Sequence, residues 1–232
     1  MALAFGHYSD GQFASGTLTW SHDCTGDDIL VVMTENFSGA YGITGVTFNG
    51  AALTAIATNI TSTNNSNPLS AWVLIAPASG SHSIVVSQSG SSTILGQGAS
   101  YSGSNATQFG TTVLGTEVTV TSNVGSFGIT TAFANSWVVM FLHECSAQNI
   151  SNGSNTTKRG AVAGFGYFAI ADSGLIASAG AQTLNVADAQ ANSFMAGILV
   201  EVKVAGGAAT FGHECFQPLS QPTNHFRPTV VM

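Results

Sequence analysis

Every cysteine in this sequence is preceded, two residues earlier, by a histidine. The three occurrences are His22-Asp23-Cys24, His143-Glu144-Cys145 and His213-Glu214-Cys215. In a β-strand, residues i and i+2 point to the same face, so each triplet would present an imidazole and a thiol together. Two such pairs supply the ligands of a tetrahedral Cys₂His₂ zinc site. The candidate metal ligands are therefore His22, Cys24, His143 and Cys145, with zinc as the ion that they would hold.

The same triplets have three other interpretations. Free cysteine is one of the most buried residue types, so the thiols would be core residues and the histidines would lie at strand ends. Two triplets could form a disulfide, although three cysteines cannot all pair within one chain and reduced thiols are the default expectation. A Cys–His nucleophilic pair is the enzymatic interpretation. Same-strand spacing is wrong for that pair, because the base should approach the sulfur from a separate element, and we expect no enzymatic activity.

The acidic residues offer little further chemistry. Asp23, Asp27 and Asp28 cluster beside a glycine, where a β-turn with Asx capping explains them, and the spacing matches no EF-hand calcium loop. Glu144 and Glu214 alternate out of phase with the flanking His and Cys, so we expect both to face solvent. The sequence has no catalytic triad order, phosphate-binding loop or Rossmann fingerprint.

Charge is scarce throughout the 232 residues. Lys and Arg number 4 against 11 Asp and Glu, which gives a net charge of -7, and charged residues make up only 6% of the chain. A typical soluble domain has about 25%. A nucleic-acid groove or an anionic membrane surface would need a basic cluster, so neither partner is expected. The only basic pair is Lys158-Arg159, which we expect at an exposed loop tip.

The first residues, Met1 to His7, have no positively charged region followed by an apolar one, so they do not form a secretory signal peptide. No apolar run approaches the roughly 18 residues of a membrane-spanning helix. We therefore expect a protein that is made in the cytoplasm, that leaves it only by lysis if at all, and that has no membrane partner.

Short β-rich runs separated by Gly, Ser and Asn clusters predict an all-β fold, without any sustained helical periodicity. Asn49-Gly50 lies between two such runs and predicts a hairpin, because both turn positions favour positive φ. Many antiparallel strands without covering helices predict a two-sheet β-sandwich of jelly-roll type. The expected sandwich domain spans residues 15–205, after an N-terminal segment of residues 1–14.

Residues 206–232 are expected to form an extended C-terminal arm. Proline removes donors from a β-ladder and biases the preceding residue toward extended conformations. An extended segment that keeps large apolar side chains is expected to dock on a sandwich, either its own or a neighbour's. The residues assigned to this assembly arm are Phe211, Phe216, Phe226, Pro218, Pro222 and Pro228.

Seven segments recur along the chain in a recognisable order: Trp20-Ser21-His22, Asp28 to Val32, Val46 to Leu53, Ala71 to Pro77, Ser100 to Gly103, Ala171-Asp172-Ser173 and Ile198 to Lys203. In these segments the chain resembles a β-sandwich module of bacteriophage structural proteins, which is also found in some secreted bacterial proteins of unassigned function. The resemblance covers about residues 15–205 and implies a fold, but it supplies no catalytic residues.

These features together predict a non-enzymatic virion structural protein of a bacteriophage, such as a capsid decoration, head-fibre or tail-associated subunit. Its partners would be copies of itself, in a trimer by analogy with viral β-sandwich fibres, and other virion proteins. One alternative is a carbohydrate-binding or receptor-binding adhesin module, which would bind a glycan. Another is a surface-filament subunit. Trp20, Trp72 and Trp137 lie in apolar strand runs, which favours core packing over a sugar-binding platform.

Overall fold

A computed structural model describes residues 3–37, 41–61, 67–145, 149–162 and 165–204 of the chain. The N-terminal half contains β1 (Ala4–Ser15), β2 (Leu18–Asp23), β3 (Ile29–Asn36), β4 (Ile43–Phe48), β5 (Ala51–Ala52), β6 (Thr54–Ile60), β7 (Leu69–Ile75), β8 (Ser81–Gln88) and β9 (Thr93–Ser102). The C-terminal half contains β10 (Ser104–Thr119), β11 (Val124–Thr131), β12 (Ser136–Glu144), β13 (Thr157–Val162), β14 (Phe165–Asp172), β15 (Gly180–Ala187) and β16 (Phe194–Val204). The all-β prediction is confirmed, and all of these strand pairings are antiparallel.

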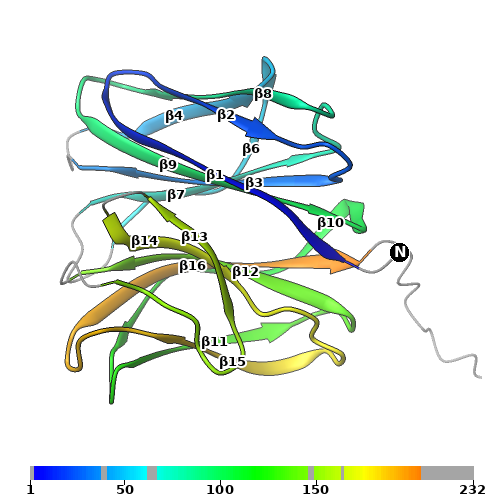
Figure 1. Ribbon diagram of the computed structural model, residues 1–232, viewed down its shortest axis with the longest axis vertical. Coiled ribbons are helices and arrows are strands. Elements are labelled where there is room, and N and C mark those ends of the chain that lie inside the picture. The colour runs from blue at the N-terminus through cyan, green and yellow to red at the C-terminus, as the bar shows by residue number, and fades with distance from the viewer. Residues whose placement is uncertain (1–2, 38–40, 62–66, 146–148, 163–164, 205–232) are drawn as a thin grey trace, which may run out of the picture.

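The strands form four sheets that stack as successive layers (Figure 1). The first outer layer has the strand order β2-β8-β4-β5, and the inner layer beneath it has the order β1-β9-β3-β7-β6. The second inner layer has the order β10-β16-β12-β14-β13, and β11-β15 forms the other outer layer. The predicted antiparallel β-sandwich is therefore confirmed, but the described residues form four packed sheets, which pair into two sandwiches, where the sequence analysis expected two sheets.

The two halves share one topology. Replacing β1, β9, β3, β7 and β6 by β10, β16, β12, β14 and β13 converts the first inner sheet into the second without changing the strand order. The outer pair β2-β8 corresponds in the same way to β11-β15, whereas β4 and β5 have no counterpart among the described strands of the C-terminal half. The described part of the chain thus contains an internal structural repeat, and the boundary between its two copies lies between β9 and β10.

Apolar cores fill the three spaces between the layers, and the largest of them lies between the two inner sheets. Alternate residues of β3 face different cores: Val31 and Met33 pack in the central core, whereas Leu30 and Val32 pack beneath the outer sheet. All eight residues of β3 are buried as a result. A strand covered on both faces needs apolar residues at successive positions, which explains the uninterrupted run Ile29 to Met33.

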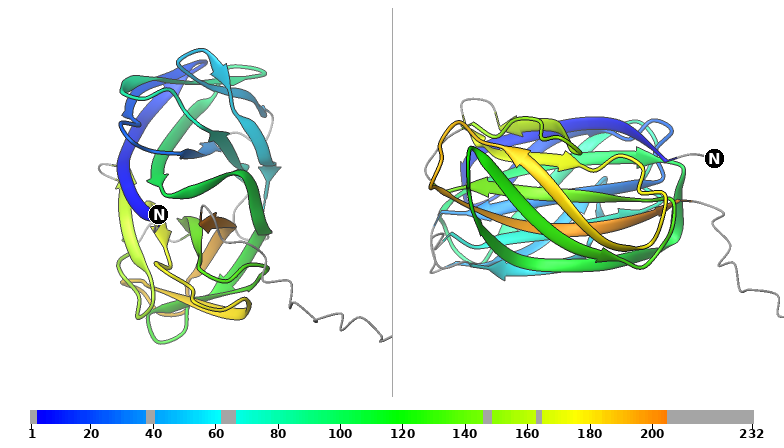
Figure 2. Two further views of the ribbon diagram at one scale, coloured as in Figure 1. Left: turned by 90° about the vertical axis from the view of Figure 1, so that its right-hand side faces the viewer. Right: turned by 90° about the horizontal axis from the view of Figure 1, so that it is seen from below.

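The inner sheets are aligned so that β6 lies beside β10 at one edge of the molecule and β1 lies beside β13 at the other (Figure 2). β6 and β10 are each the last strand of their own sheet. The described residues contain no helix that is long and apolar enough to cross a membrane.

The Asn49-Gly50 hairpin is confirmed, because the φ angles are 49° and 79° and Phe48 pairs with Ala51. After the short strand β5 the chain changes sheets, and β6 pairs with β7 in the inner layer.

Two expected positions along the chain need correction, and a third expectation falls outside the described residues. The segment 1–14 was expected to lie outside the sandwich, but β1 pairs with β9 and forms one edge of the inner sheet. The expected loop tip Lys158-Arg159 lies within β13. The predicted arm, residues 206–232, lies outside the described part of the chain.

Candidate functional site

A chain of hydrogen bonds passes through His22 in the N-terminal half. Trp20 Nε1 donates a 2.9 Å bond to Ser9 Oγ, which lies 2.7 Å from His22 Nδ1. On the other side of the ring, His22 Nε2 lies 3.0 Å from Ser100 Oγ, and Ser100 donates a 2.5 Å bond to Asp27 Oδ2. These five side chains connect β1, β2, β9 and the turn before β3. We call them the His22 network.

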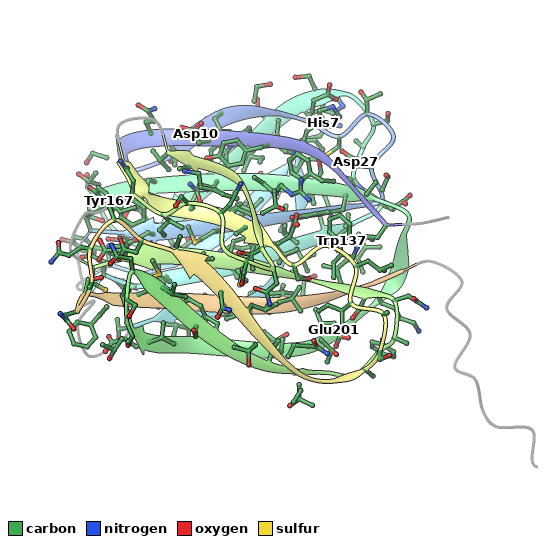
Figure 3. The ribbon with its side chains drawn as sticks, turned by 60° about the horizontal axis from the view of Figure 1, so that its bottom comes forward. His7, Asp10, Asp27, Trp137, Tyr167 and Glu201 are labelled. Atoms are coloured by element: carbon green, nitrogen blue, oxygen red, sulfur yellow. The ribbon has the colours of Figure 1, made fainter. Side chains whose placement is uncertain are left out.

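The His22 network extends to the surface through two further residues. His7 Nδ1 lies 2.9 Å from Asp27 Oδ2, and Figure 3 shows the two labelled side chains at the same end of the molecule. Asp23 Oδ1 accepts bonds of 2.8 and 2.7 Å from the backbone and hydroxyl of Thr25, which confirms the expected Asx turn. Asp28 is held separately, by a 2.5 Å bond from the Gly103 backbone N–H.

The directions of these bonds define the tautomer of His22. The Ser100 hydroxyl uses its proton on Asp27, so it accepts from His22, which places the imidazole proton on Nε2. Nδ1 then accepts from Ser9, whose oxygen accepts from Trp20. Each donor along the line therefore has an acceptor while the ring is neutral.

Burial explains why the ring stays neutral. His22 is 1% exposed. Desolvation lowers the pKa of His22 from 6.5 to about 4, with a smaller contribution from His7 that the carboxylates of Asp27 and Asp23 oppose. The neutral form is thus the one that the folded chain contains near pH 7.

The order hydroxyl, imidazole, hydroxyl, carboxylate partly resembles a nucleophilic triad, but its geometry differs in two respects. Ser100 separates the imidazole from the carboxylate, whereas in a triad the acid bonds the ring directly. The Ser9 oxygen is held between Trp20 and His22. The hydrogen bonds of the His22 network therefore join three strands to one another.

The structure does not bring the four candidate metal ligands together. Ser100, which bonds His22, pairs with Leu30, whereas Glu35, which contacts His143, lies five residues further along β3. Five residues of extended strand span about 17 Å, far more than neighbouring ligands of one zinc ion allow. Figure 3 shows the same separation, with Asp27 near one end of the molecule and Tyr167, a neighbour of His143, at the other.

The physical reason for this separation is the position of the strands. β2 lies in an outer sheet of the first half and β12 in the inner sheet of the second. Among the described residues no group of three or more His, Cys, Asp and Glu side chains could hold a metal ion. The expected site formed by His22, Cys24, His143 and Cys145 is therefore wrong, and His213 and Cys215 lie outside the described residues.

The two described cysteines are free thiols rather than a disulfide. Cys24 is fully buried in the core beneath the outer sheet, and Cys145 is half-buried at the end of β12. Burial raises the pKa of each thiol to about 12, with smaller contributions from nearby carboxylates. Both sulfurs are therefore protonated near pH 7, which makes them poor ligands and poor nucleophiles.

A second cluster is built around an ion pair in the C-terminal half and also contacts the N-terminal half. Arg159 of β13 forms a two-pronged ion pair with the fully buried Asp172 of β14, with Nε and Nη2 at 2.5 and 2.9 Å from its oxygens. Tyr101 of β9 donates a 3.2 Å bond to the same carboxylate across the central core. The guanidinium also lies 4.6 Å from the centre of the Phe5 ring and 5.6 Å from that of Trp137. Sequence reasoning missed this cluster, because it placed Arg159 in a loop.

A third cluster joins the halves at the other end of β3. His143 Nδ1 lies 3.1 Å from Glu35 Oε1, and its ring packs on Phe168 with ring centres 4.4 Å apart. Beside it, Gln97 Nε2 donates to the Phe168 carbonyl at 2.8 Å and to the Tyr8 hydroxyl at 3.2 Å. His143 therefore contributes to the interface between the two inner sheets.

Glu144 corrects a further expectation. It is fully buried instead of facing solvent. The reason is that β12 lies in an inner layer, where the side chains on both of its faces are covered. The alternation of side chains along this strand therefore produces no solvent-exposed face. The expected core packing is confirmed for Trp20 and Trp72, which are 8% and 5% exposed.

The described basic side chains are all engaged within the chain. Lys158 Nζ donates a 2.8 Å bond to the Ile150 carbonyl, and Arg159 is paired with Asp172. Lys203 Nζ lies 4.4 Å from the centre of the Phe133 ring. This part of the surface therefore presents no basic cluster to an acidic partner.

No family model matches this sequence, and no curated protein matches it.

Proposed function

We propose that this protein is a non-enzymatic structural subunit of a bacteriophage virion, made in the host cytoplasm and assembled with copies of itself and with other virion proteins. The observation that carries the proposal is how the reactive side chains are used. The described imidazole, carboxylate and guanidinium groups of the three clusters bond strands and layers to one another. A domain whose interior is held together by such hydrogen bonds and ion pairs, with a surface of uncharged polar residues, suits a structural subunit of an assembly.

The topology supports the virion assignment by analogy of fold. We infer that each half is a jelly-roll-type sandwich, because in each half the first and last strands are neighbours in the inner sheet and the second and second-last are neighbours in the outer one. A tandem pair of such units is a compact block for a shell or fibre. The segments that resemble phage structural modules fall in both halves, including Ala71 to Pro77 and Ile198 to Lys203.

The adhesin alternative has less support in the described residues. A glycan-binding platform usually presents exposed aromatic rings that stack on sugars. Among the described residues the exposed large hydrophobic side chains are Tyr41 and Leu175, which are 39% and 62% exposed. A single tyrosine is too little for such a platform, and the assembly function remains the better proposal.

Native mass spectrometry and glycan-array binding of the purified full-length chain test the proposal together. We expect a closed oligomer, with three times the chain mass as the preferred species, and no glycan binding above background. A chain that stays monomeric at all concentrations, or that binds a defined glycan as a monomer, would contradict the assembly function.

A further inference from the structure

An open apolar groove of about 540 Å³ lies where the edges of the two inner sheets meet. Its walls come from β6 and β7 on one side and from Thr112 of β10 on the other. Ile56, Leu74 and Ile75 are half-buried there and Ala55 is exposed, so apolar surface faces the opening. No charged side chain lines the groove.

The groove is bounded by unpaired strand edges. β6 ends the first inner sheet and β10 ends the second, and the two strands lie beside each other (Figure 2). The outer edge of such a strand offers backbone N–H and C=O groups to another extended segment. Strand addition at an edge, with side-chain pockets for selectivity, is a common mode of peptide recognition.

The chain leaves the described residues beside this groove. Val204, the last residue of β16, pairs with Ser104 at the start of β10. Thr112 pairs with Val200, so the groove lies only about 13 Å back along β16 from this exit. At Val204 the direction of β16 therefore points away from the groove of the same chain.

The sequence that follows has the matching chemistry. Residues 208–217 contain no proline, so they keep every backbone donor, and they include Phe211 and Phe216. Glu214 is the only charged residue among them. An uncharged groove between two strand edges fits such a segment better than it fits a charged partner.

We propose that the groove between β6–β7 and β10 receives residues 208–217 of a second copy of this chain. The inference rests on the proposed assembly function and specifies its contact. Exchange of identical arms between protomers is a low-cost route to closed oligomers. The five-residue spacing of Phe211 and Phe216 places them on opposite faces of an extended segment, so one ring enters the groove while the other points away from it.

The test uses photo-crosslinking in the full-length chain. A benzophenone amino acid replaces Phe211 or Phe216 in turn, and crosslinked peptides are mapped by mass spectrometry. We expect one of the two positions to crosslink to residues 54–56, 73–75 or 112 in a covalent oligomer. The Ala55→Glu substitution should lower that yield by about tenfold or more, because it puts a carboxylate against the incoming phenyl ring. Ala52→Glu, at another exposed alanine outside the groove, should leave the yield unchanged.

The outcomes separate the groove from the assembly function. Crosslinks to the groove within a single chain would show that each arm occupies its own groove, which overturns the exchange. Crosslinks elsewhere in an oligomer of normal mass would overturn the groove as the contact and leave the assembly function intact. A monomer without interchain crosslinks would overturn both. Thermal melts of the Ala55→Glu and Ala52→Glu variants show whether a loss of crosslinking yield comes from unfolding.

Discussion

The Tyr101 hydroxyl donates a 3.2 Å hydrogen bond to the Asp172 carboxylate, and this bond joins the last strand of the N-terminal half to the C-terminal half. Asp172 has no exposed surface, and Arg159 supplies the opposite charge. Burial raises the pKa of Tyr101 well above 10, and the Asp172 carboxylate adds to this effect. The phenol therefore stays protonated, and remains a hydrogen-bond donor, over the whole pH range in which the protein is handled.

We expect Arg159→Met to lower the free energy of unfolding by about 3 to 5 kcal/mol, because it leaves a buried carboxylate without its counterion. Urea denaturation at pH 7 measures the loss. Lys158→Met is the matched control on the same strand, and it should cost less than about 1 kcal/mol since its half-buried ammonium bonds only a carbonyl and has no buried carboxylate as a partner. Adding Asp172→Asn to Arg159→Met should restore part of the loss. Equal costs for the two single substitutions would show that the pair contributes nothing.

Trypsin provides a test of the corrected position of Lys158 and Arg159. Both lie in β13, which pairs with β14, and Lys203 lies in β16 opposite Ser136. A protease needs an extended, unpaired substrate, so native digestion should leave the body of the chain intact over residues 3–204. Gel electrophoresis and intact mass measurement check this. Fast native cleavage after Lys158 or Arg159 would mean that β13 opens readily.

Gly96 should tolerate no side chain. Gly11 and Gly96 pair across β1 and β9, and the indole of Trp20 packs against both, so that a Cβ at Gly96 would lie 2.4 Å from the ring. We expect Gly96→Ala to destabilise the fold by about 1 to 3 kcal/mol through overpacking. Gly45→Ala is the control, since a Cβ there meets nothing within 4 Å, and it should be neutral or stabilising. Thermal or urea unfolding of the two variants distinguishes them.

The strands and the all-β class were predictable from the sequence, but the number of layers was not. Alternation identified most strands, and Asn49-Gly50 identified a hairpin, because both signals are local. The repeat was not predictable in this way, since β8 and β15 share only inward-facing apolar residues at alternate positions, Ile84 and Val86 in one and Leu184 and Val186 in the other. A signal for the inner layers was present. The unbroken apolar run of β3 indicates a strand covered on both faces, which a two-sheet sandwich does not provide.

The site was less predictable, because its partners are distant in sequence. The i, i+2 spacing correctly placed His22 and Cys24 on one buried face of the chain. It could not reveal that Ser9 and Ser100 take both ring nitrogens, since serines are abundant and only the pairing of β1, β2 and β9 selects these two. In a chain with so few charges, a charged residue within an apolar strand is itself a signal of a buried partner, as Asp172 shows.

Stability should fall with acid through His22. The pKa of His22 is about 4 in the folded chain and the ordinary histidine value is 6.5, so between these two pH values the unfolded chain binds more protons than the folded chain. The contribution of neutral His22 is therefore fully present above about pH 6.5 and is lost as the pH falls toward 4. The slope approaches about 1.4 kcal/mol per pH unit, and the total is about 3 kcal/mol.

A comparison with His22→Gln isolates this effect. Glutamine keeps a donor and an acceptor but does not titrate, so the difference in unfolding free energy between wild type and variant should shrink by about 3 kcal/mol between pH 7 and pH 4. Cys24→Ala is the control, because the thiol, with its pKa raised to about 12, stays protonated throughout this range. Its cost should be the same at both pH values. Urea titrations at several pH values measure both differences, and a His22→Gln difference that does not change with pH would show that the imidazole ionises freely in the folded protein.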